Sequence, residues 1–216
     1  MKIVAISDTH GYHNNINIPD GDILIHAGDV TRYGEIHELS DINYFFHKQP
    51  HKYKILIAGN HDICFERQLS ETKELLNSVT YLQDESICIE GINIYGSPWQ
   101  PWFRDWSFNL QRGPQLKEKW DMIPENTDIL ITHGPPFGIL DKTKFRDNAG
   151  CKELKLAIDR IKPKLHIFGH IHEAYGKYIK NSTNTTCINA SICNVQFKPV
   201  YKPVNKPTVI EYKSIT

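Results

Sequence analysis

The 216-residue sequence predicts an α/β fold in which two packed sheets are flanked by helices. Three observations carry this prediction. Short apolar runs rich in Ile, Val and Leu recur along the chain, helical patterns lie between several of them, and hairpin-like segments accompany them. Continuous apolar runs of this kind are typical of strands that are buried on both faces.

Five apolar runs are predicted to form the buried strands, and each ends in Ser, Gly or His. They cover residues 2–7 (KIVAIS), 22–28 (DILIHAG), 53–59 (YKILIAG), 128–134 (DILITHG) and 164–170 (KLHIFGH). Helices are predicted over 35–49, 65–77 and 151–162, where apolar residues recur at a spacing of three or four. Pro50 and Pro163 stop the first and last of these helices.

The remaining segments are less regular. Residues 86–98 predict a hairpin that turns at Glu90–Gly91, and 175–180, 185–191 and 207–213 predict further strands, antiparallel in arrangement. Residues 97–114 hold three tryptophans and three prolines without a clean period, which predicts a structured loop. The Lys- and Pro-rich stretch 197–207 predicts an extended surface connection. We expect one domain over residues 1–216.

Composition narrows the classes of function. The formal net charge is zero, so binding of long nucleic acid is disfavoured. The five cysteines are odd in number and form no C-x-x-C, which indicates neither a disulfide framework nor a cysteine metal site. The chain starts without a signal-peptide pattern and has no apolar run near the ~20 residues of a membrane helix. We therefore expect a cytoplasmic protein with no membrane partner.

Polar side chains follow the predicted strands, at the edge where ligands gather in open α/β sheets. The candidates are Asp8, His10, Asp29, Asn60, His133, His170 and His172. Carboxylate and imidazole together suit first-row divalent ions such as Mn, Fe and Zn. The supply of ligands exceeds the need of one ion, whereas two ions bridged by one carboxylate would use all of it.

The order of these motifs makes the chain recognisable. D-x-H, G-D, G-N-H-[DE], a later lone histidine and G-H-x-H resemble the calcineurin-like metallophosphoesterase superfamily. The stretches GSPWQPWF, LITHGPP, FGHIHEAYG and NASICNVQFKPVYKPVNKP resemble its small metallophosphoesterase-domain group, once described as brain-type antigens. The resemblance covers nearly the whole chain. It implies a four-layer α/β/β/α sandwich of two mixed sheets with a dinuclear metal site.

The resemblance also assigns ligands residue by residue. It implies that Asp8, His10 and His172 hold one ion, that Asn60, His133 and His170 hold the other, and that Asp29 bridges the two. Some relatives lack the first histidine of G-H-x-H and have impaired sites, and this chain keeps it. Position 62 is Asp where many members have Glu, and its role is open between orienting an imidazole and holding a turn. Manganese is the ion expected to support activity in vitro.

The expected activity is that of a metal-dependent phosphodiesterase acting on small phosphodiesters, with cyclic nucleotides implied by the resemblance. A hydroxide that bridges the ions would attack phosphorus in line with the leaving group. His61, next to Asn60, is the candidate general acid or charge stabiliser. Trp99 and Trp102 are candidates for contact with the substrate, although such residues pack in a core or a lid more often than they stack on bases.

Three alternatives remain open at this point. The chain could be a phosphomonoesterase or a nuclease of the same superfamily. It could also be a scaffold or binding module whose metal site is vestigial. The intact set of ligands argues against the last alternative, and the neutral charge argues against a nuclease of long polymers.

Overall fold

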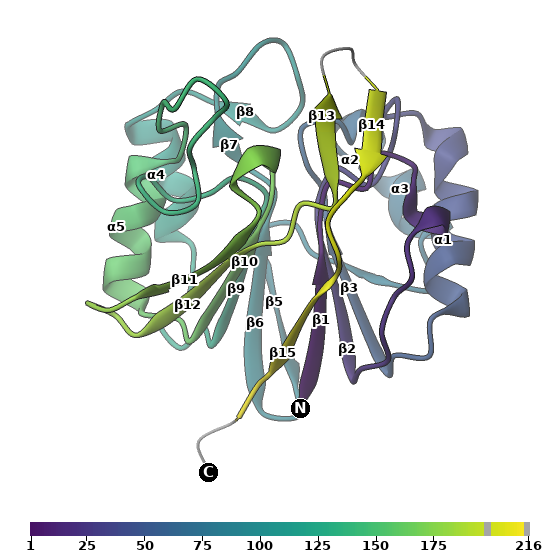
Figure 1. The fold of residues 1–216 in the computed structure, drawn as a ribbon, viewed down its shortest axis with the longest axis horizontal. Helices are drawn as coiled ribbons and strands as arrows, with labels where there is room; N and C mark the ends of the chain where they lie inside the picture. Colours follow the sequence, from purple (N-terminus) through teal and green to yellow (C-terminus); the bar gives the residue numbers. More distant parts are fainter. Residues whose placement is uncertain (197–199, 214–216) are drawn as a thin grey trace.

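Two mixed sheets pack face to face between two layers of helices (Figure 1). The computed structural model describes residues 1–196 and 200–213. Within them, the chain builds one sheet mainly from its first third and the other mainly from its second half. The four-layer α/β/β/α architecture expected from the resemblance is confirmed.

The first sheet has five strands in the order β15-β1-β2-β3-β4. Their bounds are β1 Lys2–Ile6, β2 Ile23–Ala27, β3 Tyr53–Ile57, β4 Thr80–Tyr81 and β15 Thr208–Glu211. Strands β1 to β4 pair in parallel, and β15 joins β1 antiparallel. The carboxyl ends of β1, β2 and β3 therefore meet at one edge.

The second sheet has six strands in the order β11-β12-β10-β9-β6-β5. Their bounds are β5 Glu85–Ile89, β6 Ile92–Ser97, β9 Ile129–Thr132, β10 Leu165–Phe168, β11 Gly176–Lys180 and β12 Thr185–Asn189. The four inner strands are parallel, and β5 and β11 are antiparallel at the edges. The predicted hairpin at Glu90–Gly91 and the predicted buried strands are confirmed.

Helices cover the outer face of each sheet (Figure 1). Helices α1 Leu39–Lys48, α2 Ile63–Arg67 and α3 Leu69–Leu75 lie beside the first sheet, and α4 Pro114–Asp121 and α5 Lys152–Ile161 lie beside the second. Short 3-10 turns are η1 His13–Asn15, η2 Ile36–Glu38 and η3 His172–Ala174. Apolar side chains of both sheets fill the space between them, Ile25 and Ile57 from the first and Ile131 and Ile167 from the second. Burial of each such side chain stabilises the fold by ~1.5–3 kcal/mol.

Two small strand pairs stand beyond the carboxyl edges of the large sheets (Figure 1). One is the parallel pair of β7 Gln100–Pro101 with β8 Asn109–Leu110, inside the tryptophan-rich segment 97–114. The predicted structured loop is thus confirmed. The other is the antiparallel hairpin of β13 Cys193–Gln196 with β14 Val200–Pro203.

Three predictions need correction. Residues 65–77 form two helices, because Gln68 leaves the helical region with φ −134° and ψ 44°. Apolar residues keep a helical spacing across that break, so periodicity could not locate it. Helix α4 was not predicted, since only Leu116 and Trp120 of its eight residues are buried. Part of the segment 197–207 is the strand β14 rather than a plain connection, and 197–199 lie outside the described residues.

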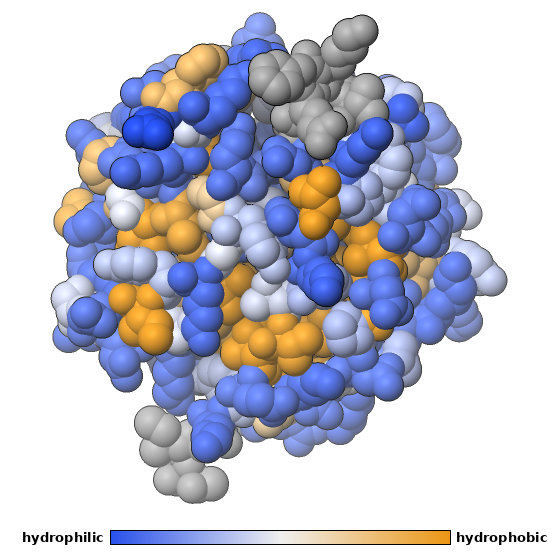
Figure 2. Space-filling view, viewed as in Figure 1, coloured by the Kyte–Doolittle hydropathy of each residue, from blue (hydrophilic) through white to orange (hydrophobic). Residues whose placement is uncertain are grey.

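The exposed apolar side chains on the face shown in Figure 2 form separate patches between polar ones. Across the described residues, no helix has both the length and the apolar character that crossing a membrane would require.

Candidate metal centre and cleft

The candidate ligands lie on tight loops that leave the sheet edges. Four of these residues have left-handed backbone angles, with φ of 53° at Asp8, 44° at His10, 54° at Asp29 and 68° at His170. Such conformations cost ~1–3 kcal/mol each outside glycine and concentrate at functional sites. Backbone hydrogen bonds hold the first two loops together, from the Asp8 amide to the Gly28 carbonyl at 2.9 Å and from the His10 amide to the Asp29 carbonyl at 3.0 Å.

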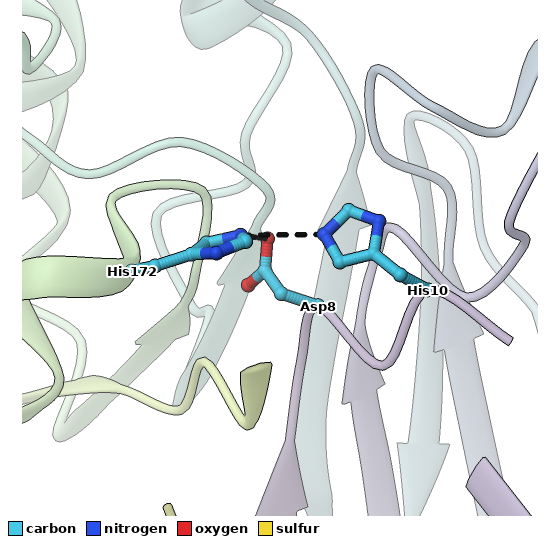
Figure 3. A group of neighbouring side chains, drawn as sticks. All are labelled: Asp8, His10 and His172. Atoms are coloured by element: carbon cyan, nitrogen blue, oxygen red, sulfur yellow. Dashed lines mark hydrogen bonds and ion pairs between the residues drawn. The ribbon is translucent and has the colours of Figure 1, made fainter. Parts of the chain in front are cut away.

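Asp8, His10 and His172 converge from opposite sheets (Figure 3). The Nε2 atoms of the two histidines face each other at 3.3 Å, and His172 Nε2 lies 3.1 Å from Asp8 Oδ1. The Nδ1 atoms of both histidines are buried without a hydrogen-bond partner. One carboxylate oxygen and two ring nitrogens thus lie close enough together to be ligands of one cation.

Asp29, Asn60 and His133 form a second convergence beside the first. His133 Nε2 lies 3.0 Å from Asn60 Oδ1 and 3.5 Å from Asp29 Oδ1. The other ring nitrogen of His133, Nδ1, donates to the Ala27 carbonyl at 3.0 Å, which leaves Nε2 as the acceptor in the neutral ring. Three acceptors therefore face each other, and this donor set also fits a divalent first-row ion.

Asp29 lies between the two groups and His170 lies at the rim. One carboxylate oxygen of Asp29 is 3.8 Å from His10 Nε2 and the other is 3.5 Å from His133 Nε2. This position suits the bridging role expected for Asp29. His170 is less close, with its ring centroid 5.0 Å from that of His133.

The charges of the site are consistent with metal ligands. Burial raises the pKa of both Asp8 and Asp29, but the histidines beside them, His172 and His133 foremost, bring each carboxyl pKa below its usual range. Burial lowers the pKa of His10 and of His170 to about 3, which keeps both rings neutral. Burial lowers the pKa of His133 as well, but Asp29 outweighs it and raises that pKa to about 9. A proton there takes the place that a cation would have, and an ion would displace it.

Asp8 is held by groups of the second sheet. Its carboxylate accepts hydrogen bonds from the His170 amide at 3.0 Å and from the Ser191 hydroxyl at 2.8 Å. Gly169 permits this approach, because a Cβ added there would lie 2.0 Å from Asp8 Oδ2. The loop after β10 can therefore contact Asp8 only with glycine at this position.

Asp62 organises the loops around the first sheet and does not face the convergence. Its buried carboxylate accepts from the amides of Thr31 at 2.9 Å and Gly59 at 2.8 Å, and from the Thr31 hydroxyl at 2.7 Å. Burial and the charge of Asp29 raise the pKa of Asp62 to about 7. The contacts favour the turn-holding role over the orientation of an imidazole.

His61 stands at the wall of a cavity that opens above the convergence. Its backbone amide donates to Asp29 Oδ1 at 2.8 Å, and its ring lies 4.7 Å from the His10 ring. The cavity has a volume of about 650 Å³, and its lining includes Asp29, Asn60, His61, His170 and His172. The candidate general acid thus shares one cleft with four of the seven candidate ligands.

The two tryptophans expected to contact substrate occupy different places. Trp102 lines the cavity and is 52% exposed. Trp99 is partly buried against the core, where its indole nitrogen donates to Asp84 at 2.8 Å and its ring packs on Phe108. The structure does not bring Trp99 to the cleft, and its position is that of a packing residue.

Two aromatic residues of the cleft were not among the sequence-based candidates. Trp106 lies 4.6 Å from the His61 ring, and Tyr201 contacts both His61 and His10. Trp106 belongs to the aromatic segment already singled out, but nothing local distinguished it from its neighbours. Tyr201 lies in the Lys- and Pro-rich stretch, and only the hairpin of β13 and β14 brings it to the site.

Comparison with known proteins identifies similar sequences and a matching family. The family model of calcineurin-like phosphoesterases matches residues 1–174. The chain is 43% identical over 235 residues to Metallophosphoesterase domain-containing protein 1 of Homo sapiens, an alignment that covers 97% of this chain and 70% of that protein. A UPF0046 protein of Caenorhabditis elegans is 40% identical over 228 residues, covering 97% of this chain and 77% of the other.

Among solved structures, the protein TT1561 of Thermus thermophilus has a TM-score of 0.58 to this chain at 13% identity. The match covers 87% of this chain and 88% of that one. At this identity the likeness concerns the fold alone.

Proposed function

The chain belongs to the calcineurin-like phosphoesterase family, and from this premise we propose that it is a phosphodiesterase that hydrolyses small phosphodiesters, cyclic nucleotides among them. One observation carries the proposal. Two carboxylates, a side-chain amide and three of the candidate histidines, His10, His133 and His172, converge beside a cavity of about 650 Å³. Asp29, Asn60, His170 and His172 line that cavity. Cavities of ~300–1,000 Å³ are typical of sites for small molecules.

Two divalent ions bound here would polarise the phosphate and make water nucleophilic at neutral pH. Asp8, His10 and His172 would hold one of them, and Asn60, His133 and His170 the other, with Asp29 between the two. The carboxylates stay ionised and the rings of His10 and His170 stay neutral in the folded chain, as ligands must. Manganese is the ion that we propose for assays in vitro.

We propose His61 as the general acid or charge stabiliser. The His61 backbone amide donates to Asp29, so the residue lies next to the proposed metal centre. Its side chain lines the cavity in which a substrate would bind. A proton given by this ring to the leaving oxygen would contribute ~10²–10⁴-fold to the rate. The effect depends on the leaving group, because an alkoxide needs protonation and a nitrophenolate does not.

The aromatic wall of the cavity supports a substrate with a flat ring. Trp102, Phe103 and Trp106 line one side, and the Arg104 guanidinium lies 5.4 Å from the Trp106 ring. Aromatic faces stack on any nucleobase, at ~1–3 kcal/mol per base by alanine substitution. Such a wall supports nucleotides over simple phosphates.

The first test compares a diester with a monoester. Protein stripped with a chelator and reloaded with Mn²⁺ should hydrolyse bis-p-nitrophenyl phosphate faster than p-nitrophenyl phosphate, and the stripped protein should hydrolyse neither. Asp29→Ala protein, purified in parallel, controls for contaminating phosphatases. Preference for the monoester would indicate a phosphomonoesterase, and no turnover beyond that control would favour a binding module.

The second test addresses substrate class. A panel of cyclic nucleotides, linear dinucleotides and long single strands should show the highest kcat/KM for cyclic nucleotides. The highest value for long strands would instead indicate a nuclease.

A further inference from the structure

The β13–β14 hairpin is attached firmly to the metal-site loops at its base. Just before it, the Ile192 amide donates to the Ser7 carbonyl at 2.8 Å, and at its first residue the Cys193 amide donates to the Asp8 carbonyl at 3.2 Å. Just after it, the Asn205 side chain donates to the Ser191 carbonyl at 2.9 Å. These contacts hold the base of the hairpin above the site.

Tyr201, on β14, reaches from this hairpin into the cleft. Its ring stacks on the His10 ring at a centroid distance of 3.7 Å and an angle of 14°. Its hydroxyl lies 3.1 Å from His61 Nε2. Tyr201 also lines the cavity, so it is in reach of a bound substrate.

The His61 ring needs such a partner. Its faces and edges are packed by His10 at 4.7 Å and Trp106 at 4.6 Å, but packing alone leaves the second side-chain torsion of histidine broad and roughly two-fold. Within residues 1–196 and 200–213, the Tyr201 hydroxyl is the hydrogen-bonding partner that the ring has. This hydrogen bond holds the Nε2 side of the His61 ring toward Tyr201 and so selects one of the two ring orientations.

We propose that Tyr201 is a positioning residue of the reaction, whose hydroxyl holds the His61 ring in the orientation that faces the leaving group. This inference rests on the proposed function, in which His61 acts on the leaving oxygen. The ring of Tyr201 makes a separate contact, since it stacks on the His10 ring. Tyr201→Phe removes the hydroxyl and keeps the stacking.

A double-mutant cycle tests the proposal by activity. Loss of one hydrogen bond changes a rate by roughly 3- to 10-fold, so Tyr201→Phe should lower kcat by that factor for a diester with an alkoxide leaving group and leave KM nearly unchanged. For bis-p-nitrophenyl phosphate the loss should be much smaller. In the His61→Ala background the same substitution should have no effect. Equal losses in both backgrounds would contradict the proposal.

Tyr178→Phe is the matched control. Tyr178 lies on the edge strand β11 and is 46% exposed, so loss of its hydroxyl should leave both substrates unaffected.

A second measurement needs no turnover. In ¹⁵N-histidine-labelled, Zn²⁺-loaded protein, the ring nitrogens of His61 are assigned by the signals lost in His61→Ala. Tyr201→Phe should shift the Nε2 resonance of His61 and broaden it, whereas Tyr178→Phe should leave it in place. An unchanged His61 signal in Tyr201→Phe would overturn the proposal even if the wild type hydrolyses no diester, so the two failures can be told apart.

Discussion

The two sheets supply different chemistry to the same site. The carboxyl edge of the first sheet provides both carboxylates and the amide oxygen, from Asp8, Asp29 and Asn60, together with one imidazole, His10. The edge of the second sheet provides imidazoles alone, from His133, His170 and His172. Each proposed ion takes ligands from both sheets, so neither edge is a site without the other.

The contact between the sheets is therefore part of the site. Below the ligands, the apolar side chains of the two sheets pack into one buried cluster. At the ligands, Gly169 of the second sheet touches the Asp8 carboxylate, and the His133 ring bonds to the Ala27 carbonyl of the first. The interface between the sheets sets the distance between oxygen and nitrogen ligands.

Asp29→Ala should have the largest effect, because the carboxylate is shared by both groups of ligands. We expect metal content well below two ions per chain and rates near background. His170→Ala, on the second sheet, should retain about one ion per chain, since it removes a ligand from one group only. Metal analysis by mass spectrometry with parallel Mn²⁺ assays checks both. Full activity of Asp29→Ala would refute a dinuclear centre.

His61→Ala distinguishes metal binding from proton transfer at the edge of the first sheet. Metal content should stay at the wild-type level, whereas kcat for an alkoxide leaving group should fall ~10²–10⁴-fold. The fall should be much smaller for a p-nitrophenolate. The acid role is untenable if both leaving groups suffer the same loss.

Gly169→Ala tests the junction between the sheets. The added methyl group would collide with the Asp8 carboxylate and the Ser7 hydroxyl, at 2.0 and 2.2 Å. We expect Mn²⁺ affinity to fall by roughly 10- to 100-fold, the usual effect of disturbing groups that hold a ligand.

Gly134→Ala is the control for this substitution, because its Cβ would meet only the Gln100 side chain, at 3.6 Å. Titration of the stripped proteins with Mn²⁺ gives both affinities. Equal affinities in the two variants would show that Asp8 can move without loss.

Trp102→Leu should have the smallest effect. Trp102 lies in the segment that follows β6 of the second sheet. With 52% of its surface exposed, Trp102 should contribute at the lower end of stacking energies, about 1 kcal/mol, seen as a raised KM for a cyclic nucleotide. KM for bis-p-nitrophenyl phosphate should not change. Trp99→Leu should instead lower the melting temperature and leave the ratio of the two kcat/KM values unchanged.

Much of this molecule is readable from local pattern. Apolar runs predict the inner strands, and residues such as Asp8, Asp29 and Asn60 follow those strands directly. Because parallel strands end at a common edge, the chain order of motifs is enough to bring these side chains together. Helix α4 and the break at Gln68 were not predicted. In both regions few side chains are buried, and the sequence pattern does not show which ones.

The walls of the cleft depend on tertiary structure. Trp99 and Trp102 lie three residues apart in one segment, yet the first bonds to Asp84 away from the cleft and the second lines the cavity. Tyr201 is 140 residues from His61 and follows no strand-end motif, and the anchored hairpin alone brings the two side chains to 3.1 Å. Ligands at strand ends are placed by backbone pairing, which leaves a mark in the sequence. The direction of a loop side chain depends on contacts with residues far away in the sequence, and these contacts leave no local sequence pattern.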